Sequence, residues 1–303
     1  MLDPTRRFRT TSETTEMDNR FITTAELIAD TINVLLPKII KDHKNLAGVI
    51  GIPRSGMLPA SIISTKLGIP LYSLSGDTIV SISSFSNSGG ARMEHYVRHD
   101  GPLVFIDDTA CSGISATRIK RRFPEYAVAS VYSTDKASKI IDHYGKMLKE
   151  PHLLEWNMFN SQLVKNALFD IDGIFCDNIP IKVCQDDRLY AEYLGNIQPL
   201  YSRIPTLFKA MALVTGRLER YRDITEKWLK QHGFNYDKLI MFPTELEGRR
   251  NSNHVFEVGT YKGKVMAEVG AALFVESEVL EAKIIRQTCQ SGIIVCPNQG
   301  ICL

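Results

Sequence analysis

The sequence predicts an α/β protein of two domains, each a doubly wound and mainly parallel sheet. Its 303 residues are enough to form two ordinary cores. In both halves short apolar runs alternate with segments of helical periodicity, the pattern of parallel strands joined by helices. Several apolar runs end directly in acidic residues, as expected where buried strands reach a ligand-binding edge. No internal repeat or long low-complexity linker separates the halves, so we expect them to be closely joined.

The first half is predicted to begin with a helix over residues 23–42. Its apolar positions have helical spacing, and Thr23 and Glu26 form a predicted capping box. A polar stretch, SISSFSNSGGAR, is expected to form a flexible loop. The remaining predicted elements, in chain order, are a strand in 46–53, a helix in 59–68, strands in 69–75 and 102–108, a helix from near Ala116 and a strand in 126–133.

The second half repeats this rhythm after a boundary that we place near residue 160. Residues 1–20 are predicted to be a polar tail, residues 21–160 the first domain and residues 163–303 the second. Strands are predicted in 166–175, 210–217, 239–242, 272–276 and 292–296, separated by helical segments that include LERYRDITEKWLKQHG, KGKVMAEVG and EVLEAKIIRQ. Trp228 has helical spacing with Ile224 and is predicted to lie in the core.

Composition and charge exclude several classes of protein. The net charge of +2 gives neither half a general affinity for nucleic acid, and no apolar run approaches the roughly 20 residues of a membrane span. No secretory signal is visible, so we expect a cytoplasmic protein; a homodimer is compatible with the sequence. His95 and His99 are four residues apart but belong to a polar segment, which favours solvated side chains over metal ligands. Six cysteines without metal-site spacing are predicted to be free thiols.

The first candidate site is VFIDDTACSGIS, residues 104–115. Asp107 and Asp108 end a predicted strand, and the loop that follows precedes a helix. Small residues let backbone amides approach an anion, and a helix N-terminus adds positive charge, so the loop suits a phosphate monoester. Adjacent carboxylates suit the vicinal hydroxyls of a sugar or a Mg²⁺ ion, although an acidic turn without function has the same pattern. The candidate loop residues are Thr109, Ala110, Cys111, Ser112, Gly113 and Ser115.

This pattern resembles the phosphoribosyl diphosphate motif of the type I phosphoribosyltransferases, with Ser112 and Ser115 where threonine is commoner. A second stretch, GIPRSGMLPA, is similar to the pyrophosphate loop of the same family. The resemblance implies that Arg54, Ser55 and Gly56 bind diphosphate and that the peptide bond between Arg54 and Ser55 is cis. Without the resemblance, this stretch is a turn with one cation.

Two further segments resemble parts of the same family. The polar loop with Arg92 resembles the flexible loop that closes over phosphoribosyl diphosphate, and an exposed linker is the alternative. PHLLEWNMF resembles the hood over the base, where Trp156 or Phe159 would stack; packing between the domains is the alternative. The family implies displacement of diphosphate by a nitrogenous base, with Asp107 and Asp108 in the site and with Mg²⁺ and Arg54 taking up the departing charge.

The second candidate site begins at ALFDIDGIF, where Asp170 and Asp172 end a predicted strand. Residues two apart in extended chain point the same way. One carboxylate can then attack a phosphorus atom while the other protonates the leaving oxygen, as phosphoryl transfer through an aspartyl-phosphate requires. Alone the pattern is weak, because it also occurs in metal sites and in turns.

The order of the later motifs resembles the haloacid dehalogenase-like phosphatases. Strand-Asp-x-Asp-Gly is followed by LVTGR, then by YKGK, and then by LFVESE. The resemblance implies that Asp170 is the nucleophile, Asp172 the acid and base, Thr215 the phosphate-binding hydroxyl and Lys262 the cation that holds nucleophile and phosphate. Lys264 is a second candidate for that cation. The chain between the first two motifs is too short for more than a minimal cap.

The resemblance also implies a Mg²⁺ site formed by Asp170, the backbone carbonyl of Asp172 and Glu276. The sequence departs from the family here, because Glu276-Ser277-Glu278 replaces the common pair of aspartates. Weak metal binding or a non-catalytic domain is the alternative. Arg217 follows the phosphate-binding threonine and is a candidate substrate ligand, although we expect a helical surface charge to meet water.

Together these resemblances predict a bifunctional enzyme of nucleotide metabolism. The first domain would join a nucleobase-like acceptor to phosphoribosyl diphosphate, and the second would hydrolyse a phosphate monoester, which could be the nucleotide product. The alternative is a regulator that binds phosphoribosyl diphosphate and has a non-catalytic second domain. Against this alternative, Asp170, Asp172, Thr215 and Lys262 are all present. The sequence does not identify the base, the phosphate ester or the pathway.

Overall fold

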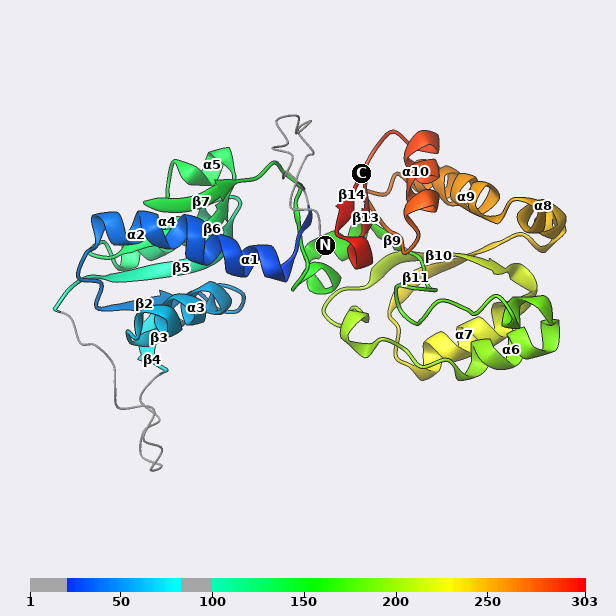
Figure 1. Cartoon of the computed structure of the whole chain (residues 1–303), viewed down its shortest axis with the longest axis horizontal. Coiled ribbons are helices and arrows are strands. Elements are labelled where there is room, and N and C mark those ends of the chain that lie inside the picture. The colour runs from blue at the N-terminus through cyan, green and yellow to red at the C-terminus, as the bar shows by residue number, and fades with distance from the viewer. Residues whose placement is uncertain (1–20, 83–99) are drawn as a thin grey trace, which may run out of the picture.

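A computed structural model describes residues 21–82 and 100–303 of the protein. These residues form two lobes, each built on one six-stranded sheet (Figure 1). The predicted α/β class is confirmed, because each sheet has four parallel pairings and one antiparallel pairing at an edge. The predicted polar tail, Arg92, His95 and His99 lie outside the described residues. All six cysteines are free, and no helix in the described part of the chain could span a bilayer.

The first sheet has the strand order β4-β3-β2-β5-β6-β7. Its strands are β2 (Gly48–Gly51), β3 (Leu71–Ser75), β4 (Thr78–Ser81), β5 (Leu103–Ala110), β6 (Ala127–Ser133) and β7 (His143–Met147). Successive side chains of β5 point to opposite faces: Val104 and Ile106 join one core cluster and Phe105 the other. Helices cover both faces of the sheet, and they are α1 (Thr24–Asp30), α2 (Leu36–Asp42), α3 (Met57–Leu67), α4 (Ile114–Arg122) and α5 (Asp135–Ser138).

The predicted capping box starts the first helix. The backbone N–H of Thr23 donates to Glu26 Oε2 at 2.8 Å, and the N–H of Glu26 donates to Thr23 Oγ1 at 3.2 Å. A π-helical stretch at Thr31–Leu35 joins α1 to α2. The helix predicted over 23–42 is therefore continuous.

The second sheet has the strand order β11-β10-β9-β12-β13-β14. Its strands are β9 (Ala167–Phe169), β10 (Ala210–Leu218), β11 (Tyr236–Phe242), β12 (Leu273–Val275), β13 (Ile293–Cys296) and β14 (Ile301–Cys302). Phe169 packs with Trp228 on one face, and Leu168 packs with Met266 on the other, so Trp228 is a core residue as predicted. The helices of this lobe are α6 (Asp187–Asn196), α7 (Arg222–Gln231), α8 (Glu247–Ser252), α9 (His254–Val269) and α10 (Val279–Thr288).

A small third sheet joins the lobes. Strand β1 (Phe21–Ile22) pairs in parallel with β8 (Leu153–Leu154). Because side chains alternate along a strand, Ile22 and Leu154 enter the core of the first lobe, whereas Phe21 and Leu153 enter the core of the second. Phe159 also belongs to the second core. The chain thus contributes to the second core before residue 160, where we predicted the first domain to end.

Replacing Phe159 by alanine should destabilise the second lobe. The ring is 9% exposed and packs against Phe169 and Phe175, with centroids 6.1 Å away in each case. Loss of such a buried ring costs about 3 kcal/mol. We expect urea unfolding to show this decrease for F159A, whereas F256A should have little effect because Phe256 is 50% exposed. Equal effects of the two variants would contradict this assignment.

Candidate active sites

A cavity of about 220 Å³ lies at the carboxyl end of β5. It is lined by Asp107 and by the predicted loop residues Thr109, Ala110, Cys111, Ser112, Gly113 and Ser115, together with Ile52, Ile114, Ala116, Val128, Ser130 and Ile141. Strand β5 extends to Ala110 and α4 begins at Ile114, so the loop is shorter than predicted. Gly113 has φ +74°, and a Cβ there would lie 2.4 Å from Ile140 Cδ1. The tight turn therefore requires glycine.

The two adjacent aspartates have different environments. Asp108 is buried, and both of its oxygens accept hydrogen bonds from protein groups: Oδ1 from Ser55 Oγ at 2.9 Å and Oδ2 from Trp156 Nε1 at 2.8 Å. Asp107 lines the cavity instead. Burial, and next the charge of Asp108, raise the pKa of Asp107 well above its ordinary value. Asp107 is therefore the carboxyl group of the pair that is available to a ligand in the cavity.

The predicted pyrophosphate loop lies directly against the end of β5. A Cβ on Gly56 would lie 2.6 Å from the carbonyl oxygens of both Ile52 and Ile106, so only glycine fits this close approach. A cis peptide bond is present, but it joins Pro53 to Arg54, so the predicted position between Arg54 and Ser55 is wrong by one residue. Pairing with β5 continues to Ile52, whose N–H donates to Ile106 O at 2.9 Å, and the loop follows directly. Arg54 is exposed and does not line the cavity.

The two candidate stacking residues have separate positions. Trp156 is half-buried, and its indole N–H is held by Asp108. Phe159 packs against Phe169 and Phe175 in the second core. It is therefore not placed to stack on a base, and the alternative of packing between the domains fits this residue. The sequence could not separate the two, because both are aromatic residues of one segment.

His152 is a neighbour of the first site that the sequence analysis missed. Its Nε2 lies 3.0 Å from Thr109 Oγ1 and 3.5 Å from Cys111 Sγ. Burial lowers the pKa of His152, and the ring links the segment after β7 to the end of β5 and the loop that follows it. The only sequence signal was a histidine in the predicted hood, PHLLEWNMF.

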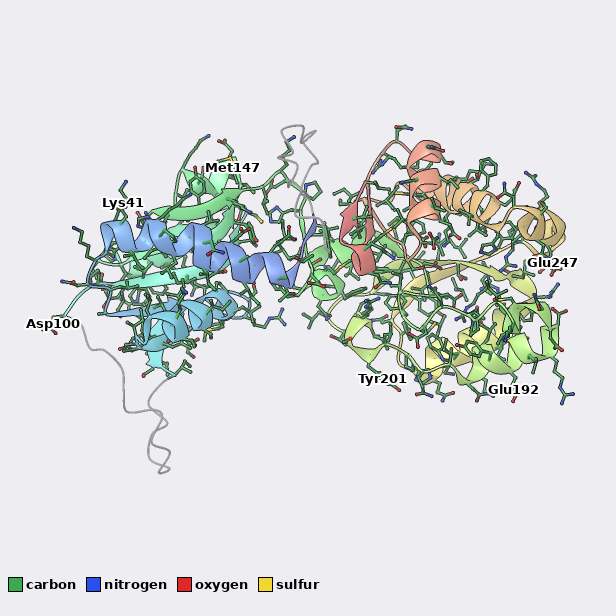
Figure 2. The ribbon with its side chains drawn as sticks, in the orientation of Figure 1. Lys41, Asp100, Met147, Glu192, Tyr201 and Glu247 are labelled. Atoms are coloured by element: carbon green, nitrogen blue, oxygen red, sulfur yellow. The ribbon has the colours of Figure 1, made fainter. Side chains whose placement is uncertain are left out.

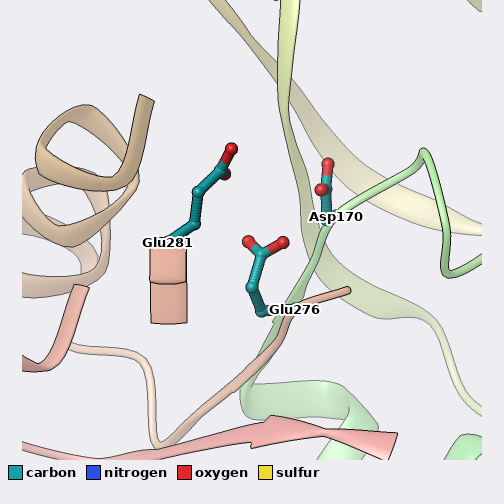
Figure 3. Close-up of side chains that lie close together, drawn as sticks. All are labelled: Asp170, Glu276 and Glu281. Carbon is teal, nitrogen blue, oxygen red and sulfur yellow. The ribbon is translucent and has the colours of Figure 1, made fainter. Parts of the chain in front are cut away.

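The second site is a buried cluster at the carboxyl ends of β9 and β12. Lys262 Nζ donates to Asp170 Oδ2, Glu276 Oε2 and Glu281 Oε2, at 2.8 Å in each case. Figure 3 shows the three carboxylates converging from separate elements. All four residues are buried. Burial raises the pKa of Asp170 to about 8, although the charge of Lys262 opposes this shift.

The positions of two residues in this cluster differ from what the sequence predicted. Lys262 lies within α9 rather than ahead of a helix, because α9 begins at His254. Lys264 is exposed, which removes it as the second candidate for the same role. Glu281 was not predicted to belong to the site. It lies five residues after Glu276, in the first turn of α10, and this position was its only signal in the sequence.

Asp172 points away from the cluster and toward Arg217. Arg217 Nε lies 3.0 Å from Asp172 Oδ2, and Arg217 Nη2 lies 2.6 Å from Asp172 Oδ1. Arg217 belongs to β10 and is 1% exposed, so the expectation of a solvated helical charge is wrong. Both side-chain oxygens of Asp172 are therefore engaged by the guanidinium of Arg217.

Thr215 is fully buried in β10. Its Oγ1 accepts a hydrogen bond of 3.2 Å from the backbone N–H of Arg217. It is not among the residues that line the cavity beside the cluster. The hydroxyl therefore bonds within the last part of β10 and does not face this cavity.

A cavity of about 490 Å³ opens beside the cluster. Its lining includes the carboxylates of Asp170, Asp172, Glu276, Glu278 and Glu281 and the cations Arg217, Arg250 and Lys262. Acidic groups thus outnumber cations in this lining. The volume lies in the range of small-molecule sites, which is about 300–1,000 Å³.

The carboxylate cluster fits a magnesium ion. Ligand atoms from Asp170, Glu276 and Glu281 all lie within 4.8 Å of one another. Hard oxygen donors are the ligands that Mg²⁺ prefers. Asp170 and Glu276, which the resemblance implied as ligands, belong to this group, and Glu281 is an additional oxygen donor; Lys262 Nζ contacts all three, and the side chain of Asp172 is engaged with Arg217.

Comparisons with known proteins connect part of the chain to phosphoribosyltransferases. The xanthine-guanine phosphoribosyltransferase of Chromohalobacter salexigens is 28% identical over 105 residues, which are 34% of this chain and 62% of that protein. The enzyme of the same name from Gluconobacter oxydans is 25% identical over 118 residues, 37% of this chain and 67% of that protein. The chain thus spans about two thirds of the length of these relatives. No protein-family model matches the chain.

Solved structures of phosphoribosyltransferases also align with part of the chain, but with low similarity. A purine phosphoribosyltransferase from Pyrococcus horikoshii Ot3 aligns with a TM-score of 0.32 and 17% identity, covering 45% of this chain and 92% of that one. The sequence relatives therefore connect only about a third of the chain to phosphoribosyltransferases.

Magnesium should stabilise the protein through the second site. Mg²⁺ at a hundred times its Kd adds about 2.7 kcal/mol, which raises Tm by roughly 5–10 °C in a domain of this size. We expect differential scanning fluorimetry to show this increase for the wild type and to show most of it lost in E276Q. The exposed control E268Q should keep the increase. An unchanged Mg²⁺ effect in E276Q would contradict the assignment.

Proposed function

We propose that the chain is a bifunctional enzyme of nucleotide metabolism. Its first activity transfers a phosphoribosyl group from phosphoribosyl diphosphate to a nitrogenous base of the purine or orotate type. The observation that carries this proposal is the small-residue loop after Asp107 and Asp108, in a chain that is partly similar in sequence to xanthine-guanine phosphoribosyltransferases.

The residues of the first site have distinct proposed roles. Backbone amides of the 109–115 loop bind the 5′-phosphate, aided by the N-terminus of α4. Asp107 binds the ribose hydroxyls, and Arg54 binds the diphosphate. The base forms its bond to the anomeric carbon as the carbon–oxygen bond to diphosphate breaks, and positive charge near the leaving diphosphate stabilises the transition state. Mg²⁺ bound with the substrate would supply part of that charge.

The second proposed activity is hydrolysis of a phosphate monoester through an aspartyl-phosphate. The contact of Asp170 with Lys262, next to Glu276, supports it. An oxygen of Asp170 attacks phosphorus, the bond from phosphorus to the alcohol oxygen breaks, and Asp172 protonates that oxygen. Water then hydrolyses the aspartyl-phosphate and regenerates Asp170. Asp172 must leave Arg217 and bring a proton to the alcohol oxygen in this step, because Arg217 contacts both of its side-chain oxygens in the structure.

The two sites do not form one continuous cavity in the described parts of the chain. Residue Asp100 precedes β5 at the outer end of the first lobe, so the carboxyl end of β5 faces the second lobe (Figure 2). The carboxyl end of β10 lies at the opposite side of the second lobe, where Arg220 Nη2 contacts Glu247 Oε1 at 2.8 Å. A nucleotide made at the first site would therefore reach the second through solvent.

Trp156→Phe tests the first site. The variant keeps an aromatic ring but removes the indole N–H that holds Asp108. Loss of one hydrogen bond to a charged group costs about 1.5 kcal/mol, or roughly tenfold in affinity. We expect isothermal titration calorimetry to show this weaker binding of phosphoribosyl diphosphate. W228F is the matched control, because its indole N–H donates to Ile197 O within the second lobe. Comparable weakening in both variants would contradict the role of Trp156.

Asp170→Asn tests the second site and the bifunctional proposal together. Purified protein is incubated with Mg²⁺, phosphoribosyl diphosphate and a panel of purine and pyrimidine bases, and products are identified by mass spectrometry. We expect the wild type to release nucleoside and phosphate and D170N to accumulate nucleotide, with phosphate release reduced at least 1,000-fold, or about 4 kcal/mol.

Two results would contradict parts of this proposal. Phosphate release that is unchanged in D170N would exclude this aspartate as the nucleophile. Binding of phosphoribosyl diphosphate without transfer to any base would favour the regulator that the sequence left as the alternative.

A further inference from the structure

Arg250 differs from the other two cations of the second cavity. Arg217 is neutralised by Asp172, and Lys262 is surrounded by carboxylates. Arg250, in α8, is half-buried and lines the same cavity. Among the described residues no carboxylate forms a salt bridge with it. Its charge is therefore available to a ligand.

The guanidinium of Arg250 is held in a fixed direction. Its Nε donates to the carbonyl oxygen of Gly216 at 2.9 Å, and its Nη1 lies 3.3 Å from Asn251 Oδ1. Gly216 belongs to β10, which also carries Arg217. A guanidinium anchored through Nε still presents N–H groups that can bind an anion, and little side-chain freedom remains to be lost on binding.

Arg250 stands at the side of the cavity that leads away from the carboxylate cluster. With Cys184 and Tyr190 it also lines a smaller cavity of about 50 Å³. The other residues around that smaller cavity are Asp187, Leu218, Arg220, Tyr221, Glu247 and Asn251. Asp170, Glu276 and Glu281 do not line this smaller cavity. Arg250 is thus placed beside the alcohol portion of an ester whose phosphate contacts Asp170.

His254 does not compete with Arg250 as a cation. It lines the large cavity and lies 3.6 Å from Glu281 Oε1. Its ring thus has a carboxylate partner, whereas no carboxylate of the described residues forms a salt bridge with Arg250.

We infer that the second site takes phosphate monoesters whose alcohol portion carries a second anionic group, and that Arg250 binds this group. The inference rests on the proposed phosphatase function. It narrows the substrate class, because a sugar phosphate or nucleotide with no other anion leaves Arg250 without a partner. A carboxylate and a second phosphate are the two anions that a guanidinium fork recognises.

The test compares matched pairs of esters in the wild-type protein with Mg²⁺. One pair is 3-phosphoglycerate and glycerol 3-phosphate, and the other is ribose 1,5-bisphosphate and ribose 5-phosphate. We expect kcat/KM to favour the doubly anionic member of at least one pair, and that pair identifies the anion. In R250M this preference should fall about 30-fold, the loss of a hydrogen-bonded charge pair.

R249M is the matched control, and R250K tests the charge. Arg249 is the neighbouring residue of α8, but it pairs with Glu257 and does not line the cavity, so its loss should leave the preference unchanged. R250K should restore part of the preference. An equal loss for both members of each pair, or no preference in the wild type, would overturn the inference.

Binding to D170N separates this inference from the proposed phosphatase activity. Isothermal titration calorimetry compares the two members of each pair on D170N and on the double variant D170N/R250M. Selective binding that depends on Arg250, in a protein that hydrolyses none of the esters, would refute the phosphatase and support the inference. Hydrolysis without selectivity between the esters would support the phosphatase and refute the inference about Arg250. Absence of hydrolysis and of selective binding would refute the phosphatase and the inference.

Discussion

Parallel strand pairing is the constraint on which both candidate sites depend. In the first sheet Gly51 pairs with Ile106, so the loop after β2 and the end of β5 meet at one edge. In the second sheet Phe169 pairs with Val275. These residues end β9 and β12, and Asp170 and Glu276 follow them directly. Because all carboxyl ends of parallel strands lie at the same edge, residues distant in sequence come together there. A shift of register would separate them.

Charged side chains are buried together at this edge in the second lobe. One ammonium group, that of Lys262, faces three carboxylates in a region nearly without solvent. Burial still dominates at Asp170, whose pKa rises despite this partner. Such a cluster gains little net stability from its ion pairs, because desolvation offsets their attraction. A divalent cation would reduce the repulsion among these carboxylates, so metal binding would be coupled to the stability of the cluster.

The junction between the lobes has a second constraint, the alternation of side chains in a two-stranded sheet. Phe21 and Ile22 are neighbours in sequence but belong to different cores. The segment after β8 continues this arrangement, since Trp156 bonds to Asp108 of the first site while Phe159 packs in the second lobe. The lobes are therefore joined by segments whose side chains pack in both cores, rather than by a free linker, although their sites open in different places.

Local patterns in the sequence determined the α/β class, most strand and helix positions and the acidic residues at strand ends. These follow from periodicity and from the order of motifs along the chain, both of which are short-range properties. The pairing of Asp172 with Arg217, the place of Lys262 within α9 and the contributions of Glu281 and Arg250 depended on tertiary structure. They depend on how helices far along the chain pack over the sheet edge. Only packing decides which of several acids or arginines faces a cavity, because their spacing in sequence is the same in either case.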